Sequence, residues 1–240
     1  MKPYPIELIE TRRKYLLFKN DIGVPDAARW GQLYESFIYE FIRKHLHTVI
    51  GGTTVIDIGA NFGFHTLEFS ELVGESGKVH SFEPQKFVFY QLCGNLLLNG
   101  CDNVIPHNVA LGDVSKVVMM ERPDYYSEGK INIGDTHVGL QNAQDRVAEK
   151  RLDDYHINNV SVIKIDVQGF EPFVLDGARE TILRNKPVIF IEVEPGQLQL
   201  YGFTPSDILD RLTALGYTYR KPVDQPSHYD YVAIPLKGAI

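Results

Sequence analysis

The hydrophobic positions of this chain follow two periods, one typical of strands and one typical of helices. Short apolar runs rich in β-branched and aromatic residues predict strands at 15–18, 55–58, 78–84, 103–111, 160–167 and 187–194. Apolar residues that recur every three or four positions predict helices at 30–45, 64–73, 84–98, 171–183 and 204–215. This alternation predicts an α/β fold with a mostly parallel sheet and helices on both of its faces.

The two ends of the chain depart from the regular alternation. Helix 30–45 carries an apolar stripe that begins at Trp30, and we expect this stripe to pack against the sheet. Near the C-terminus, strands are predicted at 217–223 and 229–235, with only residues 224–228 between them. A connection this short favours an antiparallel hairpin. We expect one domain overall, in which an N-terminal strand and helix (1–50) pack on the sheet of residues 51–240.

The first central strand leads directly into a glycine-rich turn and then into a helix. Gly59 and Gly63 let the backbone approach a ligand closely, and Asn61 between them tolerates a positive φ. Unpaired N–H groups at the start of the helix provide a ligand site. Asp57, at the end of the strand, would repel a phosphate but would hold a hydroxyl or a cation. Taken alone, the turn could equally be a tight strand-to-helix connection.

The second central strand makes a ligand site the better interpretation. It ends at Glu83-Pro84, and Glu83 follows Gly63 by twenty residues. At about this spacing a doubly wound fold places a carboxylate on ribose hydroxyls. Glu83 could otherwise be an acid at a helix start with no ligand.

Four segments carry the most specific pattern in the chain. In order, they are Asp57-x-Gly59-Ala60-Asn61-x-Gly63, Phe82-Glu83-Pro84, Asn108-Val109-Ala110-Leu111-Gly112-Asp113 and Lys164-Ile165-Asp166-Val167-Gln168-Gly169-Phe170-Glu171. As a set, which extends from about residue 53 to residue 194, they resemble the FkbM-type S-adenosylmethionine-dependent methyltransferases. The resemblance implies a Rossmann-like class I methyltransferase fold with strand order 3-2-1-4-5-7-6 and an antiparallel last strand. Family members commonly have Glu at the position of Gln168, so no acidic role is assigned to that residue.

The resemblance also implies where S-adenosylmethionine would bind. Glu83 would hold the ribose, and the strand end at 108–110 would enclose adenine, with Asn108 facing the exocyclic amine. A polar strand end without a ligand is the alternative for Asn108. The predicted cofactor set is Asp57, Gly59, Ala60, Asn61, Phe62, Gly63, His65, Thr66, Glu83, Pro84, Asn108, Val109, Ala110 and Asp166.

An irregular segment separates the third strand from the fourth. Residues 115–122 predict an extra strand, but from 123 to 144 the periodicity disappears and three glycines, two adjacent tyrosines and His137 occur. Long irregular segments inside compact domains are usually functional or disordered. We therefore expect residues 113–150 to be an insert that covers the substrate, with 123–144 as a lid.

Charged residues gather at the predicted strand ends. Lys164 and Asp166 share one face of the fourth strand, and Glu192 and Glu194 share one face of the fifth. Ligands of an open α/β sheet bind at the carboxyl ends of its strands, so these acids should border one crevice together with Glu83. A negative rim suits a sulfonium cation better than a pyrophosphate.

Methyl transfer to a hydroxyl needs in-line positioning and removal of a proton. We predict Asp166 next to the transferred methyl, with Glu192 as its partner. The two would be a base with its orienting acid, or two ligands of a Mg²⁺ or Mn²⁺ ion. Lys164 and His137 complete the predicted catalytic set. Lys164 could instead only neutralise Asp166, and His65, another candidate base, suits a structural role at its helix start better.

The composition of the chain narrows the range of binding partners that we expect. Hydrophobic residues make up 44% of the 240 residues and charged ones 23%, as in soluble globular proteins. The net charge of −7 makes a nucleic-acid partner less expected. No apolar run is long enough for a membrane span, and the N-terminus lacks a signal-peptide core. Cys93 and Cys101 show no metal-ligand spacing, which fits reduced cysteines in a cytoplasmic protein.

The resemblance implies O-methylation of a sugar hydroxyl in a glycan, glycolipid or glycosylated metabolite. A small-molecule or glycan hydroxyl acceptor is therefore the expected partner. Three alternatives remain. They are an RNA ribose methyltransferase, an NAD oxidoreductase, which Asp57 opposes, and a noncatalytic module that has kept the fold. The sequence identifies neither the sugar nor its hydroxyl, and it leaves open whether the chain forms a homo-oligomer.

Overall fold

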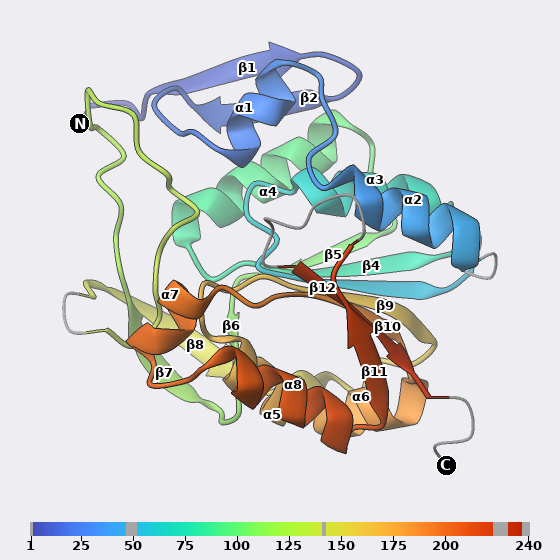
Figure 1. Ribbon diagram of the computed structural model, residues 1–240. Coiled ribbons are helices and arrows are strands. Elements are labelled where there is room, and N and C mark those ends of the chain that lie inside the picture. The colour runs from blue at the N-terminus through green and yellow to red at the C-terminus, as the bar shows by residue number, and fades with distance from the viewer. Residues whose placement is uncertain (1, 47–51, 141–142, 223–229, 237–240) are drawn as a thin grey trace.

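A seven-stranded sheet forms the centre of the protein (Figure 1). The computed structural model describes residues 2–46, 52–140, 143–222 and 230–236. The sheet order is β11 (Tyr217–Arg220), β12 (Asp230–Pro235), β10 (Val188–Glu192), β9 (Val160–Ile165), β3 (Thr54–Ile58), β4 (Lys78–Phe82) and β5 (Val104–His107). Counting the strands of this sheet in chain order gives 3-2-1-4-5-7-6, and β12 is antiparallel to both of its neighbours. The predicted sheet order and the antiparallel last strand are therefore confirmed.

Helices cover both faces of this sheet. In Figure 1, α2 (Ser36–His45), α3 (Phe64–Val73) and α4 (Lys86–Leu98) lie above it, and α5 (Glu171–Gly177), α6 (Arg179–Asn185) and α8 (Pro205–Ala214) lie below. Successive side chains of each strand point to opposite faces of the sheet, so each strand packs against both helical layers. Val55 of β3 packs in the upper core, while its neighbour Ile56 packs in the lower core. None of the helices that the structure describes is long and apolar enough to cross a membrane.

The N-terminal region forms a separate hairpin that packs on α4. Strands β1 (Ile6–Glu10) and β2 (Lys14–Phe18) are antiparallel, and β1 was not predicted. Two asparagines of α4 fix the hairpin, because Asn95 Oδ1 accepts from the Leu16 N–H at 2.6 Å and Asn99 Oδ1 accepts from the Lys14 N–H at 3.0 Å.

The predicted helix 30–45 is wrong in its first third. A short helix, α1 (Val24–Arg29), precedes it, and α2 begins only at Ser36. Pro25 lies in the first turn of α1, and Gly31 and Glu35 have φ angles of 64° and 49°, which interrupt the helical path. As a result Trp30 is 76% exposed rather than packed against the sheet.

The insert, together with the residues just before it, forms a second, three-stranded sheet beside the main one, in the order β6-β8-β7. The predicted strand 103–111 is wrong as one piece, because β5 ends at His107 and the chain turns at Asn108 and Val109 before β6 (Ala110–Leu111). The predicted extra strand is confirmed as β7 (Lys116–Met120). It pairs antiparallel with β8 (Asp145–Lys150), which the pattern did not reveal.

Three further boundaries differ from the prediction. The helix expected at 171–183 is broken at Ala178, which separates α5 from α6. Strand β10 ends at Glu192, and Glu194 instead caps the unpredicted helix α7 (Pro195–Leu200). The 3₁₀ helix η1 (Leu152–Tyr155) was not predicted either. Helix α8 follows Thr204 as expected, whereas the predicted hairpin loop 224–228 lies outside the described residues.

Candidate active site

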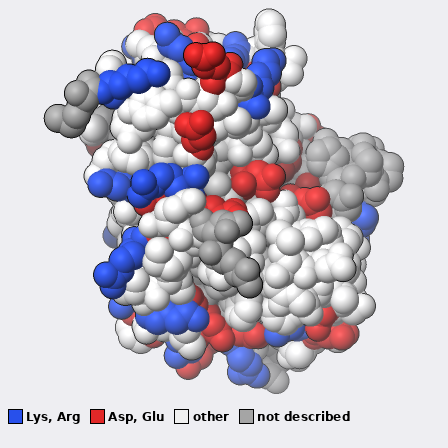
Figure 2. Space-filling view, turned by 90° about the vertical axis from the view of Figure 1, so that its left-hand side faces the viewer, with Lys and Arg blue, Asp and Glu red and all other residues white. Residues whose placement is uncertain are grey.

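A cavity of about 330 Å³ lies where the central parallel strands end. Three parts of the chain enclose it: the strand ends, the N-terminal region and the insert. Figure 2 views this edge of the molecule and shows acidic side chains near the middle of the face, with basic ones mostly nearer its outline. The N-terminal region contributes Gly23, Val24, Tyr34 and Glu35, and the insert contributes Met120, Asn132, Gly134, Asp135, Thr136 and Val138.

The glycine-rich turn after β3 forms one wall of the cavity. Gly59, Asn61 and Gly63 all have positive φ, at 78°, 51° and 94°, as predicted for this turn. A Cβ atom at Gly59 would overlap the backbone carbonyl of Asp166, so only glycine fits between the ends of β3 and β9. The turn therefore places Asp166 directly beside the cavity, while the N–H groups of Gly59, Ala60 and Asn61 are already engaged by the Phe82 carbonyl and the Glu83 carboxylate.

Glu83 shapes this wall from the end of β4. Its carboxylate is 4% exposed and accepts the Asn61 N–H at 2.9 Å and the Gln85 N–H at 2.7 Å. Burial raises the pKa of Glu83 to about 7, although the two N–H groups favour the charged form. Each carboxylate oxygen keeps a second acceptor site, so Glu83 can still receive two hydroxyl groups from a ligand.

Only some of the predicted cofactor residues line the cavity. Asp57 lies behind the turn, where its Oδ2 accepts the Thr66 hydroxyl at 2.6 Å and its Oδ1 has no hydrogen-bond partner among the described residues. Asn108 donates to the Glu83 and Pro84 carbonyls. Phe62, Gly63, Thr66, Asp57 and Asn108 are absent from the wall, whereas Gly59, Ala60, Asn61, His65, Glu83, Pro84, Val109, Ala110 and Asp166 line it.

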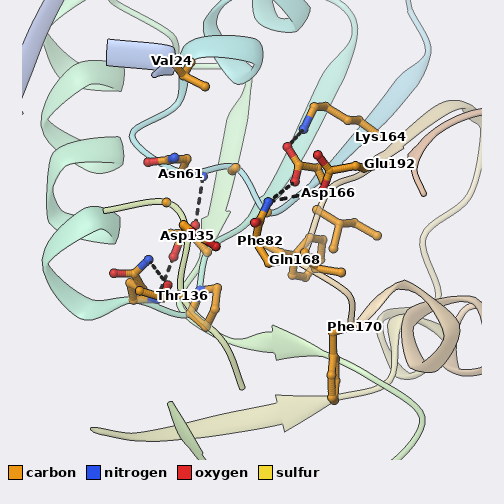
Figure 3. A pocket seen from close by; sticks show the side chains of 18 of the residues that line it. Val24, Asn61, Phe82, Asp135, Thr136, Lys164, Asp166, Gln168, Phe170 and Glu192 are labelled. Atoms are coloured by element: carbon orange, nitrogen blue, oxygen red, sulfur yellow. Dashed lines mark hydrogen bonds and ion pairs between the residues drawn. The ribbon is translucent and has the colours of Figure 1, made fainter. Parts of the chain in front are cut away.

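The opposite wall consists of charged side chains and the amide of Gln168 (Figure 3). Lys164 is buried on β9, and its ammonium group donates to Asp166 Oδ2 at 3.1 Å. Gln168 stands at φ 55°, and its amide donates to Asp166 Oδ1 at 3.0 Å and to Glu192 Oε2 at 3.3 Å. The structure thus brings together Lys164, Asp166 and Glu192, three of the four predicted catalytic residues.

These neighbouring acids hold different protonation states. Burial opposes ionisation of Asp166, but the Lys164 ammonium lowers the pKa of that carboxyl below its usual value. Burial and the charge of Asp166 raise the pKa of Glu192 to about 11. Opposite Glu192 on β12, burial and nearby carboxylates raise the pKa of Asp230 to about 8. At neutral pH, Asp166 is therefore ionised and Glu192 carries a proton.

The predicted metal pair does not fit this arrangement. Within residues 2–46, 52–140, 143–222 and 230–236, no three His, Cys, Asp or Glu side chains are grouped so as to hold a metal ion. Lys164 and Gln168 already occupy Asp166, and Glu192 is protonated at neutral pH. The chemistry of these residues is that of an acid–base cluster.

The N-terminal region supplies wall residues that sequence reasoning missed. Glu35 contacts His65, with its Oε2 3.2 Å from the imidazole Nε2, while the Tyr39 hydroxyl bonds to His65 Nδ1. Both ring nitrogens of His65 are thus engaged, which favours the structural role at the helix start. Glu35 lies in an isolated turn with positive φ, and no short pattern in the sequence marks it.

The predicted lid is packed and lies at the cavity. Ile133 is fully buried, and its N–H donates to Asp21 Oδ1 at 2.9 Å. Gln85 donates to the Ile133 carbonyl at 2.9 Å and to the Thr136 hydroxyl at 2.6 Å. The N-terminal loop and the start of α4 therefore fix this segment across the cavity.

His137 has a different environment from the one expected of a base. Its Nδ1 bonds to Glu121 at 2.7 Å and its Nε2 to Gln197 at 2.7 Å, and it does not line the cavity. Burial opposes its charge, but the hydrogen bonds to Gln197 and Glu121 raise the pKa of His137 above the ordinary value. With both nitrogens occupied, His137 has no free lone pair to take a proton from an acceptor.

The fold and this site together define a Rossmann-like methyltransferase. Residues 57–219 match the model of the methyltransferase FkbM domain, and the chain belongs to this family. The predicted family and fold are therefore confirmed. No curated protein matches the chain.

Solved structures show the same fold at low sequence identity. A methyltransferase FkbM from Methylobacillus flagellatus KT is 17% identical, with a TM-score of 0.53 over 76% of this chain and 43% of its own. A putative rRNA methylase from Clostridium thermocellum is 15% identical, with a TM-score of 0.52 over 82% and 92%. A SAM-dependent O-methyltransferase from Thermotoga maritima is 19% identical, with a TM-score of 0.50 over 97% and 78%. The chain thus spans less than half of the Methylobacillus protein.

Proposed function

We propose that this protein is an S-adenosylmethionine-dependent O-methyltransferase that acts on a sugar hydroxyl of a glycan, glycolipid or glycosylated metabolite. The observation that carries the proposal is that two chemically different walls face the same cavity. One wall consists of the glycine turn and Glu83, and the other contains an ionised Asp166 held by a buried lysine.

The donor set of the first wall fits the cofactor. Glu83 offers two carboxylate oxygens for a ribose, and backbone groups at Gly59 to Asn61 border the same space. The apolar side chains of Val109, Leu111 and Phe170 give the cavity a face suited to a purine ring. Around the whole cavity, the many acids and the single lysine of the described lining suit a sulfonium better than a phosphate. When bound, S-adenosylmethionine would supply an activated methyl group.

The second wall would handle the acceptor proton. Asp166 can accept a proton from a hydroxyl, and Lys164 holds this carboxylate in place. A carboxylate of low pKa suffices, because the hydroxyl becomes acidic as its oxygen gains a carbon. Protonated Glu192 can donate a hydrogen bond to a second oxygen of the acceptor. Removal of the proton by a positioned base typically contributes about 10²–10⁴-fold to a rate.

The charge of the wall favours an uncharged polyhydroxyl acceptor. Glu35, Asp135, Glu194 and Asp166 border the cavity, whereas Lys164 is its only lysine or arginine among the described residues and already pairs with Asp166. A phosphate or carboxylate on the acceptor would be repelled. The same argument disfavours RNA, in which each acceptor ribose carries phosphates, although the match to a putative rRNA methylase keeps that acceptor in the test.

The experiment is a methyl-transfer assay with labelled S-adenosylmethionine and matched acceptors. Neutral oligosaccharides, the same sugars bearing uronate or phosphate groups, and a short RNA would be compared, with product detected by mass spectrometry. We expect the labelled methyl group to be bound as a methyl ether to a hydroxyl oxygen of a neutral sugar. Transfer to the RNA alone would contradict the glycan proposal. Failure to bind the cofactor would contradict the methyltransferase activity itself.

A further inference from the structure

The second wall of the cavity, which contains Lys164, Asp166 and Glu192, is called the acceptor wall. A chain of side-chain hydrogen bonds runs from this acceptor wall to the insert. Gln168 donates to Asp166 and accepts at its Oε1 from Gln197 Nε2, at 3.1 Å. Gln197 also donates to Asp135 at 2.9 Å, and its Oε1 lies 2.7 Å from His137 Nε2. His137 Nδ1 in turn lies 2.7 Å from Glu121 Oε2. The relay, defined as Asp166, Gln168, Gln197, His137 and Glu121, joins the end of β9, helix α7 and the end of β7.

The two ends of the relay determine which way the amide groups of Gln168 and Gln197 point. A protonated His137 donates from both nitrogens, so Gln197 must present its oxygen to the ring. Gln197 then turns its NH₂ group towards Gln168, whose oxygen accepts it. Gln168 is thereby left with its NH₂ group facing Asp166, as Figure 3 shows for the last contact.

Loss of one of the two ring protons of His137 would leave a nitrogen lone pair facing an oxygen atom of Gln197 or Glu121. If that lone pair faced Gln197, the amide would have to flip, and its oxygen would then meet the Gln168 oxygen. Gln168 would flip in turn and place an oxygen against Asp166. If the lone pair instead faced the Glu121 carboxylate, that contact would be repulsive. Either result disturbs hydrogen bonds of about 1 kcal/mol or more each.

The groups around His137 favour its charged form. Glu121 lies just beyond β7, Asp135 lies 3.9 Å from Nε2 on the same segment, and the Tyr201 hydroxyl after α7 bonds to the adjacent Val138. The ring side chain is 12% exposed. None of these neighbours is a cation, so the imidazolium has two nearby acids to balance it.

We propose that Gln168 and Gln197 are positioning residues that orient Asp166 towards the acceptor, and that protonated His137 sets the direction of their amides. Asp166 remains the group that contacts the acceptor. This role rests on the proposed function, since it concerns the residue assigned to remove the acceptor proton. It also gives His137 a task other than that of a base.

The pH dependence follows from the raised pKa of His137. The protonated arrangement is complete below the ordinary histidine pKa of about 6.5 and is lost as pH rises through the higher pKa of the folded protein. Methyl transfer should therefore show an alkaline decline in kcat whose midpoint equals the pKa of His137. In a His137→Gln variant, this decline should disappear.

The decisive variant is Gln197→Glu. Its carboxylate would still accept from His137 but could not donate to Gln168 or Asp135. We expect kcat to fall about tenfold while the KM for the cofactor changes less than twofold. Gln199→Glu makes the same change of charge on the exposed side of α7 and serves as the matched control. An equal loss in the control, or no loss in Gln197→Glu, would overturn the positioning role.

A nuclear magnetic resonance titration tests the relay without any turnover. The Asp166 side-chain carboxyl carbon should follow the titration of the His137 ring in the wild type and should stop doing so in Gln168→Leu. Independent titrations in the wild type, or a His137 pKa at or below about 6.5, would overturn the relay. If the titrations are coupled but no methyl is transferred, the relay holds and the proposed function fails.

Discussion

The two walls of the cavity are built in different ways. The cofactor wall comes from one turn and the strand next to it, and its key contacts join residues about twenty positions apart, such as Glu83 and Asn61. The acceptor wall gathers side chains from five elements or loops, including Glu35, Gln168 and Gln197. Local backbone geometry therefore determines the first wall, and tertiary packing determines the second. A change in the cofactor wall should therefore affect binding, and a change in the acceptor wall should affect turnover.

The largest expected effect is on turnover in the acceptor wall. Asp166→Asn keeps an oxygen for Lys164 but removes the proton acceptor. We expect kcat to fall at least about a hundredfold, with cofactor affinity nearly unchanged, because a positioned base contributes about 10²–10⁴-fold. Steady-state kinetics with the best neutral sugar would measure it. A kcat within a few-fold of the wild type would remove Asp166 from the chemistry.

The second effect concerns the turn of the cofactor wall. Gly59→Ala would introduce a Cβ that overlaps the Asp166 carbonyl at φ 78°, whereas Gly202, at φ 80°, has no atom within 4 Å of such a Cβ. Gly202→Ala should cost only the backbone strain of about 1–2 kcal/mol. Gly59→Ala should cost more and should also weaken cofactor binding.

Denaturant unfolding of both alanine variants, with calorimetric cofactor titrations, measures this difference. Equal losses of unfolding free energy in the two variants, with intact cofactor binding in both, would show that the close approach of the turn to β9 is unimportant.

The same contrast explains which parts of the site could be predicted from the sequence. The turn, Glu83, Lys164 and Asp166 were identified because each lies in a short segment with a recognisable pattern. Glu35 and Gln197 were missed because a broken helix and an unpredicted helix carry them to the cavity. His137 was found as a titratable residue, but its environment was not predicted, because its partners, Glu121 and Gln197, are 16 and 60 residues away.

The fold shows the same limit. Hydrophobic periods identified all seven strands of the main sheet, and the resemblance supplied their order. The hydrophobic patterns did not predict the elements at sheet edges or next to loops, where regular packing is absent. Strand β8, which is half-buried and rich in charged residues, has little apolar alternation, and β1 pairs only with β2 among the strands that the structure describes. The wrong start of helix 30–45 depends on two positive φ angles that local sequence does not reveal.

A separate effect should appear in stability rather than in turnover. Glu192 has a pKa of about 11 in the fold, so the folded chain holds a proton that the unfolded chain releases above about pH 4.5. This group therefore lowers stability as pH rises between those values, by at most about 1.4 kcal/mol per pH unit. Glu192→Gln keeps the neutral shape and removes this linkage.

The melting temperature of Glu192→Gln relative to the wild type should consequently increase from pH 5 to pH 9. Glu180→Gln, at an exposed position of α6, is the control, and its difference from the wild type should stay constant. A pH-independent difference for Glu192→Gln would mean that Glu192 is ionised in the fold and that the acceptor wall holds two charges.

The most direct test of the two-wall account is a calorimetric titration of S-adenosylhomocysteine into three proteins. These are the wild type, Glu83→Gln and Asp166→Asn, each checked for an unchanged melting profile. We expect the wild type to bind, Glu83→Gln to bind about 10–100-fold more weakly through loss of charged hydrogen bonds, and Asp166→Asn to bind within about threefold of the wild type. Equal weakening in both variants, or undiminished binding by Glu83→Gln, would contradict the separation of the cavity into a cofactor wall and an acceptor wall.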